Sequence, residues 1–89
     1  MTQFALTPTD NRKSFYNKAH VLLDENGNKY LKSYDTIVLY IDSAGCVHRT
    51  WNGYSATTQR HINSFLHTYG ISPQLMGKKA FESMEVETL

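Results

Sequence analysis

The chain has 89 residues, a formal net charge of +1 and a hydrophobic fraction of 40%. This length is enough for one domain and not for two, and the composition excludes a disordered chain. No window of about 18 consecutive apolar residues is present, so we expect no membrane-spanning helix.

A single cysteine, Cys46, excludes an internal disulfide and gives no cysteine framework for a metal. The first residues lack the apolar core of a secretory signal. We therefore expect a reducing, cytoplasmic location. Charge is unevenly distributed: residues 43–81 contain four basic and no acidic residues, and residues 82–89 contain three acidic residues.

In chain order, residues 1–13 are polar and show no hydrophobic periodicity, which predicts a flexible N-terminal arm before a single domain at 14–89. Alternating apolar residues predict a strand over 15–24, and Asn and Gly after it predict a tight turn to a return strand at 29–34. The run IVLYI at 37–41 is the most β-prone and is predicted as the central strand. A further turn and strand follow, ending near Trp51.

The clearest helix is predicted over residues 55–69, with Ser55 as its N-cap and Gly70 after its C-terminus. Apolar residues recur within it at spacings of three and four. A short helix is predicted from Lys78 to Met84. The pattern predicts an α+β fold, in which an antiparallel sheet of three to four strands is covered by the main helix. The expected core is Val21, Leu23, Ile37, Leu39, Ile41, Val47, Trp51, Ile62, Phe65 and Leu66.

One dense motif follows the last predicted strand and opens the main helix. It has the form W-x-G-Y-S-x-T-T-x-R-H-I-x-x-F and comprises Trp51, Gly53, Tyr54, Ser55, Thr57, Thr58, Arg60, His61, Ile62 and Phe65. Over roughly residues 14–70 the chain resembles a family of small uncharacterised proteins of Firmicutes and their phages, plasmids and conjugative elements. The resemblance implies a bacterial or phage cytoplasmic accessory protein and assigns no catalytic residues.

The polar part of this motif has two interpretations. A helix N-terminus with Arg60 and His61 nearby can bind an anion such as phosphate or an acidic side chain. Alternatively, Ser55 caps the helix, the Thr hydroxyls bond to local backbone and His61 is a partly buried structural residue. We favour the structural interpretation, because a cap is preferred at every helix start.

Catalytic groupings are weak. Ser55, His61 and Asp35 can be drawn as a triad, but the motif lacks a nucleophile elbow and the Ser serves as a cap. Cys46 and His48 share a strand face, which permits a reactive thiol without arguing for one. The histidines lack the spacing of metal ligands, and there is no Gly-rich phosphate loop. We expect no enzymatic activity, metal or cofactor.

Aromatic residues form 12% of the chain. Tyr30, Lys32 and Tyr34 are expected on one strand face, where the rings either stack bases, anchor a protein interface or pack under the helix.

The function expected from these features is that of a small non-enzymatic binding protein from a mobile element or phage, which docks on and modulates a macromolecule as anti-CRISPR-like inhibitors do. The partner is expected to be a host or phage protein, with a homodimer among the open oligomeric states. The alternative is a nucleic-acid-binding accessory factor that uses the cationic region 43–81. The expected binding residues are Arg49, Trp51, Tyr54, Thr57, Arg60, His61, His67, Lys78 and Lys79.

Overall fold

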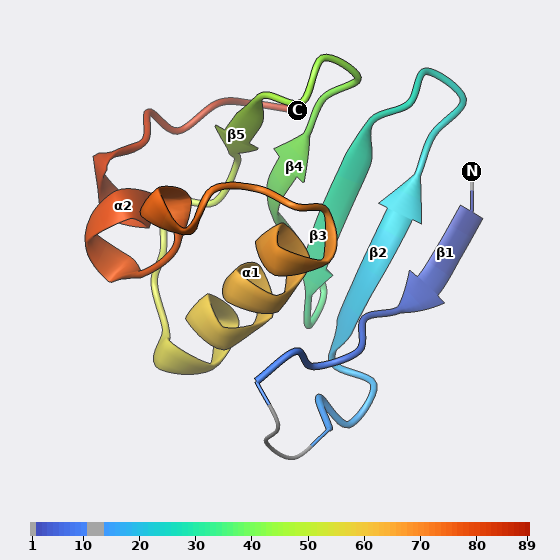
Figure 1. Ribbon diagram of the computed structural model, residues 1–89, viewed down its shortest axis with the longest axis horizontal. Helices are drawn as coiled ribbons and strands as arrows, with labels where there is room; N and C mark the ends of the chain where they lie inside the picture. The colour runs from blue at the N-terminus through green and yellow to red at the C-terminus, as the bar shows by residue number, and fades with distance from the viewer. Residues whose placement is uncertain (1, 11–13) are drawn as a thin grey trace.

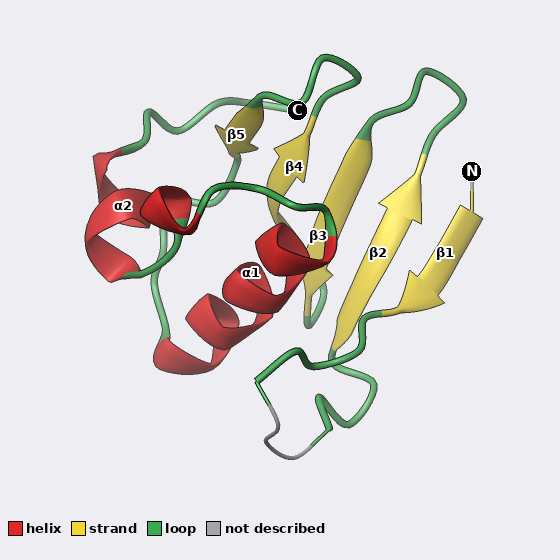
Figure 2. Cartoon of the chain, in the orientation of Figure 1, coloured by secondary structure: helices red, strands yellow, loops and turns green. Residues whose placement is uncertain are grey.

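The computed structural model describes residues 2–10 and 14–89, and a five-stranded antiparallel sheet forms its centre. The strands lie side by side in chain order from β1 to β5 (Figure 1). Helix α1 crosses one face of the sheet, and the turn η1 and helix α2 pack beside it (Figure 2). The elements are β1 (Thr2–Ala5), β2 (Ala19–Leu23), β3 (Lys29–Ser33), β4 (Thr36–Ile41), β5 (Val47–Arg49), α1 (Ala56–Thr68), η1 (Pro73–Leu75) and α2 (Lys78–Ser83).

The predicted α+β fold is confirmed, with an antiparallel sheet, one main helix and a short C-terminal helix. The predicted number of strands was slightly low, because β1 adds a fifth. This extra strand also makes β3 the central strand of the sheet, so the prediction that residues 37–41 are central was wrong. The IVLYI run forms most of β4, which lies between β3 and β5.

The described part of the N-terminal segment does not form an arm, because it joins the sheet. Residues Thr2–Ala5 pair with β2 as strand β1, and Leu6 is only 5% exposed in the core. The Thr9 amide donates to Ser64 Oγ on α1 at 3.1 Å. The polar composition of residues 1–13 predicted a flexible arm, but the pairing of backbone groups does not require an apolar side-chain pattern. Residues 1 and 11–13 of the expected arm lie outside the described residues.

Helix α1 begins and ends as its sequence predicts. The Ser55 hydroxyl accepts a hydrogen bond from the Thr58 amide at 3.1 Å, so it satisfies one of the free amides of the first turn. Gly70 follows the C-terminus with φ of 69°, which places it in the left-handed region. In the described part of the chain, no helix is both long and apolar enough to cross a membrane.

A bulge in β4 changes which residues face the core. Leu31 pairs with Leu39 and Lys32 pairs with Ile37, so Val38 is the extra residue between them. Val38 and Leu39 are both buried, whereas Ile37 is only half-buried. The prediction of Ile37 as a core residue was therefore wrong, because strict alternation does not hold across a bulge.

The core lies between α1 and the sheet. Of the predicted core residues, Val21, Leu39, Ile41, Ile62, Phe65 and Leu66 are buried there, while Leu23, Val47 and Trp51 are partly buried against it. The sequence prediction missed further buried residues, which come from irregular segments, from β2 to β4 and from α2. They are Leu6, Phe15, Ala19, Leu31, Val38 and Phe81.

Candidate functional site

His61 lies inside the protein and bonds to the sheet. Its side chain is 1% exposed, and its Nδ1 atom lies 2.9 Å from Ser33 Oγ at the end of β3. Ser33 Oγ also lies 2.9 Å from Thr58 Oγ1, so one hydroxyl joins α1 to β3 at two points. Phe15 packs edge-on against the imidazole with ring centroids 4.6 Å apart. A partner cannot reach this imidazole, and we no longer place His61 at a binding surface.

Burial lowers the pKa of His61 below its usual value, and the neighbouring Arg60 charge lowers it further. The imidazole is therefore neutral at physiological pH, and its hydrogen bond links α1 to β3. It bonds to Ser33 rather than to Ser55, whose hydroxyl caps the helix. The Ser55–His61–Asp35 grouping considered from the sequence is not assembled.

Arg49 is the second buried polar residue of the expected binding set. It is 6% exposed, and its guanidinium lies 4.3 Å from the centre of the Phe81 ring. The guanidinium donates to backbone carbonyls of two chain segments. In the first they are Trp51 (2.8 Å) and Gly53 (3.4 Å), and in the second they are Phe81 (3.2 Å), Glu82 (3.4 Å) and Met84 (3.4 Å). Arg49 thus fastens the C-terminal segment to β5 and is not available to a phosphate.

The Trp51–Gly53 pair explains the start of the motif. A Cβ atom added at Gly53 would lie 2.4 Å from the Trp51 ring, which no real contact allows. Glycine is therefore needed so that the indole can fold back over the chain. This part of the motif is structural, and Trp51 is partly buried against the core.

Arg60 forms a bidentate ion pair with Asp10. Its Nε atom lies 2.7 Å from Asp10 Oδ2 and its Nη2 atom lies 3.1 Å from Oδ1. The guanidinium also lies 4.6 Å from the centre of the Phe15 ring. With Tyr54, Arg60 lines an open pocket of about 410 Å³ beside the first turns of α1.

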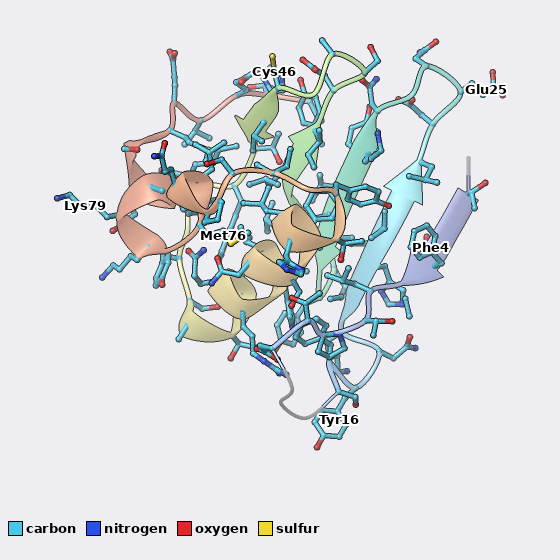
Figure 3. All side chains as sticks on the ribbon, in the orientation of Figure 1. Phe4, Tyr16, Glu25, Cys46, Met76 and Lys79 are labelled. Carbon is cyan, nitrogen blue, oxygen red and sulfur yellow. The ribbon has the colours of Figure 1, made fainter. Side chains whose placement is uncertain are left out.

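The remaining expected residues are dispersed. Lys78 lies over the Tyr54 ring at 5.1 Å, and Lys79 points away from α2 (Figure 3). Thr57 and His67 are exposed near opposite ends of α1. Of the four cations in 43–81, one is buried and one is paired with Asp10, which weakens the case for a nucleic-acid site in this region.

A more coherent surface lies on the sheet face opposite α1, which we call the outer face. Leu31 and Ser33 of β3 point toward α1, so Tyr30 and Lys32, which alternate with them along the strand, point to the outer face. Strand register aligns one row of side chains across all the strands of this face: Gln3, Leu22, Tyr30, Tyr40 and His48.

Aromatic rings are in contact along this row. The Tyr30 and Tyr40 rings lie 5.3 Å apart, and the Tyr40 and His48 rings are stacked at 4.5 Å. From Leu22 to His48 the row is half-buried. The sequence predicted Tyr30, Lys32 and Tyr34 on one strand face. The prediction for Tyr34 was wrong, because Tyr34 lies past the end of β3 at φ of 55° with its ring near His61. Tyr40 and His48 were missed, because only the strand register brings them beside Tyr30.

Carboxylates lie beside the row between Tyr30 and His48. Tyr30 donates its hydroxyl to Asp24 Oδ2 at 2.8 Å, and hydrogen bonds from Asn28 and Tyr30 lower the Asp24 pKa from 3.8 to about 2. His48 Nε2 lies 2.7 Å from Asp42 Oδ2, and His48 Nδ1 lies 2.7 Å from Glu87 Oε2. Across the described residues, no cluster of His, Cys, Asp and Glu is suited to hold a metal ion.

His48 joins the C-terminal segment to the sheet. Glu87 also donates its amide to the Arg49 carbonyl at 2.7 Å, beside a parallel bridge between Arg49 and Val86. The hydrogen bonds to Asp42 and then Glu87 raise the pKa of His48 above its usual 6.5. His48 is therefore committed to these carboxylates rather than to the exposed Cys46.

We expect the His48 contacts to make stability depend on pH. Because the folded-state pKa is raised, the contribution is fully present below pH 6.5 and is lost as the pH rises through the raised value. The melting temperature of wild type should therefore exceed that of His48→Gln most at about pH 5–6 and least at about pH 9. His61, whose lowered pKa gives stability the opposite dependence on pH, is present in both proteins, so its contribution cancels in the difference. A difference that stays constant over this range would contradict the prediction.

The comparisons with known proteins give a family and no activity. The chain matches a family of unknown function, DUF8033, over residues 4–83. No curated protein and no solved structure matches it.

Proposed function

From the premise that this chain belongs to the DUF8033 family of unknown function, we propose that it is a small non-enzymatic binding protein. It docks on another protein through the outer face of its sheet. The observation that carries the proposal is the row of contacting rings on that face, Tyr30, Tyr40 and His48, next to Leu22.

Tyrosine supports docking because its ring buries a large area while its hydroxyl accepts or donates a hydrogen bond. Tyrosines are enriched among the residues that dominate binding energy at protein interfaces. In this row the rings are held by the pleated sheet and by their contacts with one another, so little side-chain entropy is lost on binding. Lys32 beside the row adds a charge that can select a partner.

A protein partner is favoured over nucleic acid by the charges around the row. Asp24 accepts a hydrogen bond from Tyr30, and Asp42 and Glu87 bond to His48. With a pKa of about 2, Asp24 stays ionised at neutral pH. Such carboxylates repel a phosphate backbone, whose contacts normally supply most of the non-specific affinity for nucleic acid.

The setting we propose is the cytoplasm of a bacterium that carries a phage or other mobile element. The motif from Trp51 to Phe65 supports this setting through its resemblance to proteins of such elements. In that setting, docking would modulate a host or phage protein, as an anti-defence inhibitor does.

Affinity capture from bacterial lysate with matched variants tests the proposal. Leu22→Glu places a charge in the row directly beside Tyr30, whereas Lys79→Glu changes an exposed charge on α2. We expect wild type and Lys79→Glu to recover the same protein, and Leu22→Glu to recover at least about tenfold less, as at a binding hot spot. Circular dichroism of each variant verifies that it is folded.

Two outcomes contradict the proposal. One is a partner that Leu22→Glu still captures and Lys79→Glu loses. The other is retardation of single-stranded DNA or RNA by micromolar wild type at low salt, which would support the nucleic-acid alternative instead.

A further inference from the structure

The free edge of the sheet lies at β1. Strand β1 pairs with β2 on one side only, and its four residues are exposed. Natural edge strands are usually protected by short length, charged residues, proline or a bulge. Strand β1 is short, with four residues, but it carries no charge, proline or bulge, and the Phe4 side chain is 41% exposed at this edge (Figure 3). The opposite edge strand, β5, is partly covered by the bridge to Val86.

The hydrogen-bond pattern shows which backbone groups of β1 are free. The Leu6 amide donates to the Ala19 carbonyl at 2.9 Å, and antiparallel pairs alternate between bonded and non-bonded. Phe4 therefore forms a bonded pair with Val21, whereas Gln3 and Ala5 sit opposite β2 without bonding to it. The amide and carbonyl groups of Gln3 and Ala5 point away from the sheet.

We propose that β1 pairs antiparallel with β1 of a second copy of this chain, about a two-fold axis at Phe4. In this register Gln3 faces Ala5 of the other copy, so every outward amide and carbonyl of the two residues is paired. The two Phe4 side chains then face each other in a non-bonded pair, where cross-strand side chains approach most closely. The two five-stranded sheets become one continuous sheet.

A second copy fits this edge for two reasons. The edge has no charged residue between Thr2 and Leu6, so identical strands meet without repulsion. The bonding pattern is also self-complementary, because the outward residues lie symmetrically on either side of Phe4. With only four residues in the strand, the interface is at the small end of specific contacts, and the dimer should be weak and concentration-dependent.

Sedimentation equilibrium on a pair of matched variants tests this proposal. Gln3→Pro removes one outward amide and leaves the bonds to β2 in place, while Gln3→Ala keeps that amide. We expect the mass of wild type and of Gln3→Ala to rise from the monomer value of 10.2 kDa toward twice that value with concentration. Gln3→Pro should remain monomeric over the same range.

Phe4→Lys supplies a second variant, because it puts two like charges opposite each other and should also give a monomer. Circular dichroism shows whether both variants keep the fold. Wild type that stays monomeric at about millimolar concentration overturns the proposal, as does a dimer that persists in both folded variants. These outcomes leave the docking test unaffected, since that test relies on Leu22 within β2.

Discussion

Replacing Arg49 with alanine is expected to lower the free energy of unfolding by about 3 kcal/mol or more. The guanidinium serves carbonyls of two segments far apart in the chain, those near Trp51 and those of residues 81–84. Removing it takes a donor from one buried and several part-buried carbonyls, and each buried polar group left unsatisfied costs about 1–3 kcal/mol. The contact with the Phe81 ring is lost as well.

Urea denaturation measures the change, and hydrogen exchange locates it. Protection should fall first in residues 78–89, because Arg49 holds that segment. Arg49→Lys should recover little of the loss, since one ammonium group cannot span carbonyls on both sides. As a control, the exposed substitution Lys79→Glu should change stability by less than about 0.5 kcal/mol. An Arg49→Ala protein as stable as wild type would mean that the guanidinium is free to serve a partner.

Replacing His61 with alanine is expected to cost about 2–3 kcal/mol of stability. The substitution opens a cavity beside Phe15 and removes one of the two hydrogen-bond partners of Ser33 Oγ. Both effects are large because the imidazole is almost fully buried. Binding to a captured partner should remain when it is measured below the melting temperature of the variant, where the protein is folded.

Thermal unfolding and capture of the partner by the same His61→Ala preparation test this prediction together. His67→Ala is a matched control, because His67 lies on the same helix and is exposed. Unchanged thermal stability with lost binding would contradict the structural role and make the Ser55–His61 segment a binding site.

Local chemistry was enough to predict most elements of the fold. Ser55 and Gly70 carry the side-chain and backbone properties of helix ends, and the apolar spacing between them matches one helix face. Turns rich in Asn, Asp and Gly separate β2 from β3 and β4 from β5, and hairpins of this kind form from local turn chemistry.

Long-range pairing was not predictable in the same way. The sequence of Thr2–Ala5 shows no alternation of apolar and polar residues, and all four residues are exposed, so no side-chain pattern indicated its backbone pairing with β2. Arg49 looked available because its partners are carbonyls, which no side-chain pattern reveals. The outer-face row depends on register and on the bulge at Val38, neither of which periodicity can supply.

Footprinting of the captured complex by hydroxyl radicals tests the central claim most directly, because it reports which side chains a partner covers. If the outer face docks, Leu22, Tyr30 and Tyr40 become protected, while Tyr54 and His67 react as in the free protein. Protection of Tyr54 and His67 with an unchanged outer face would contradict the account and place the binding surface on the helical side.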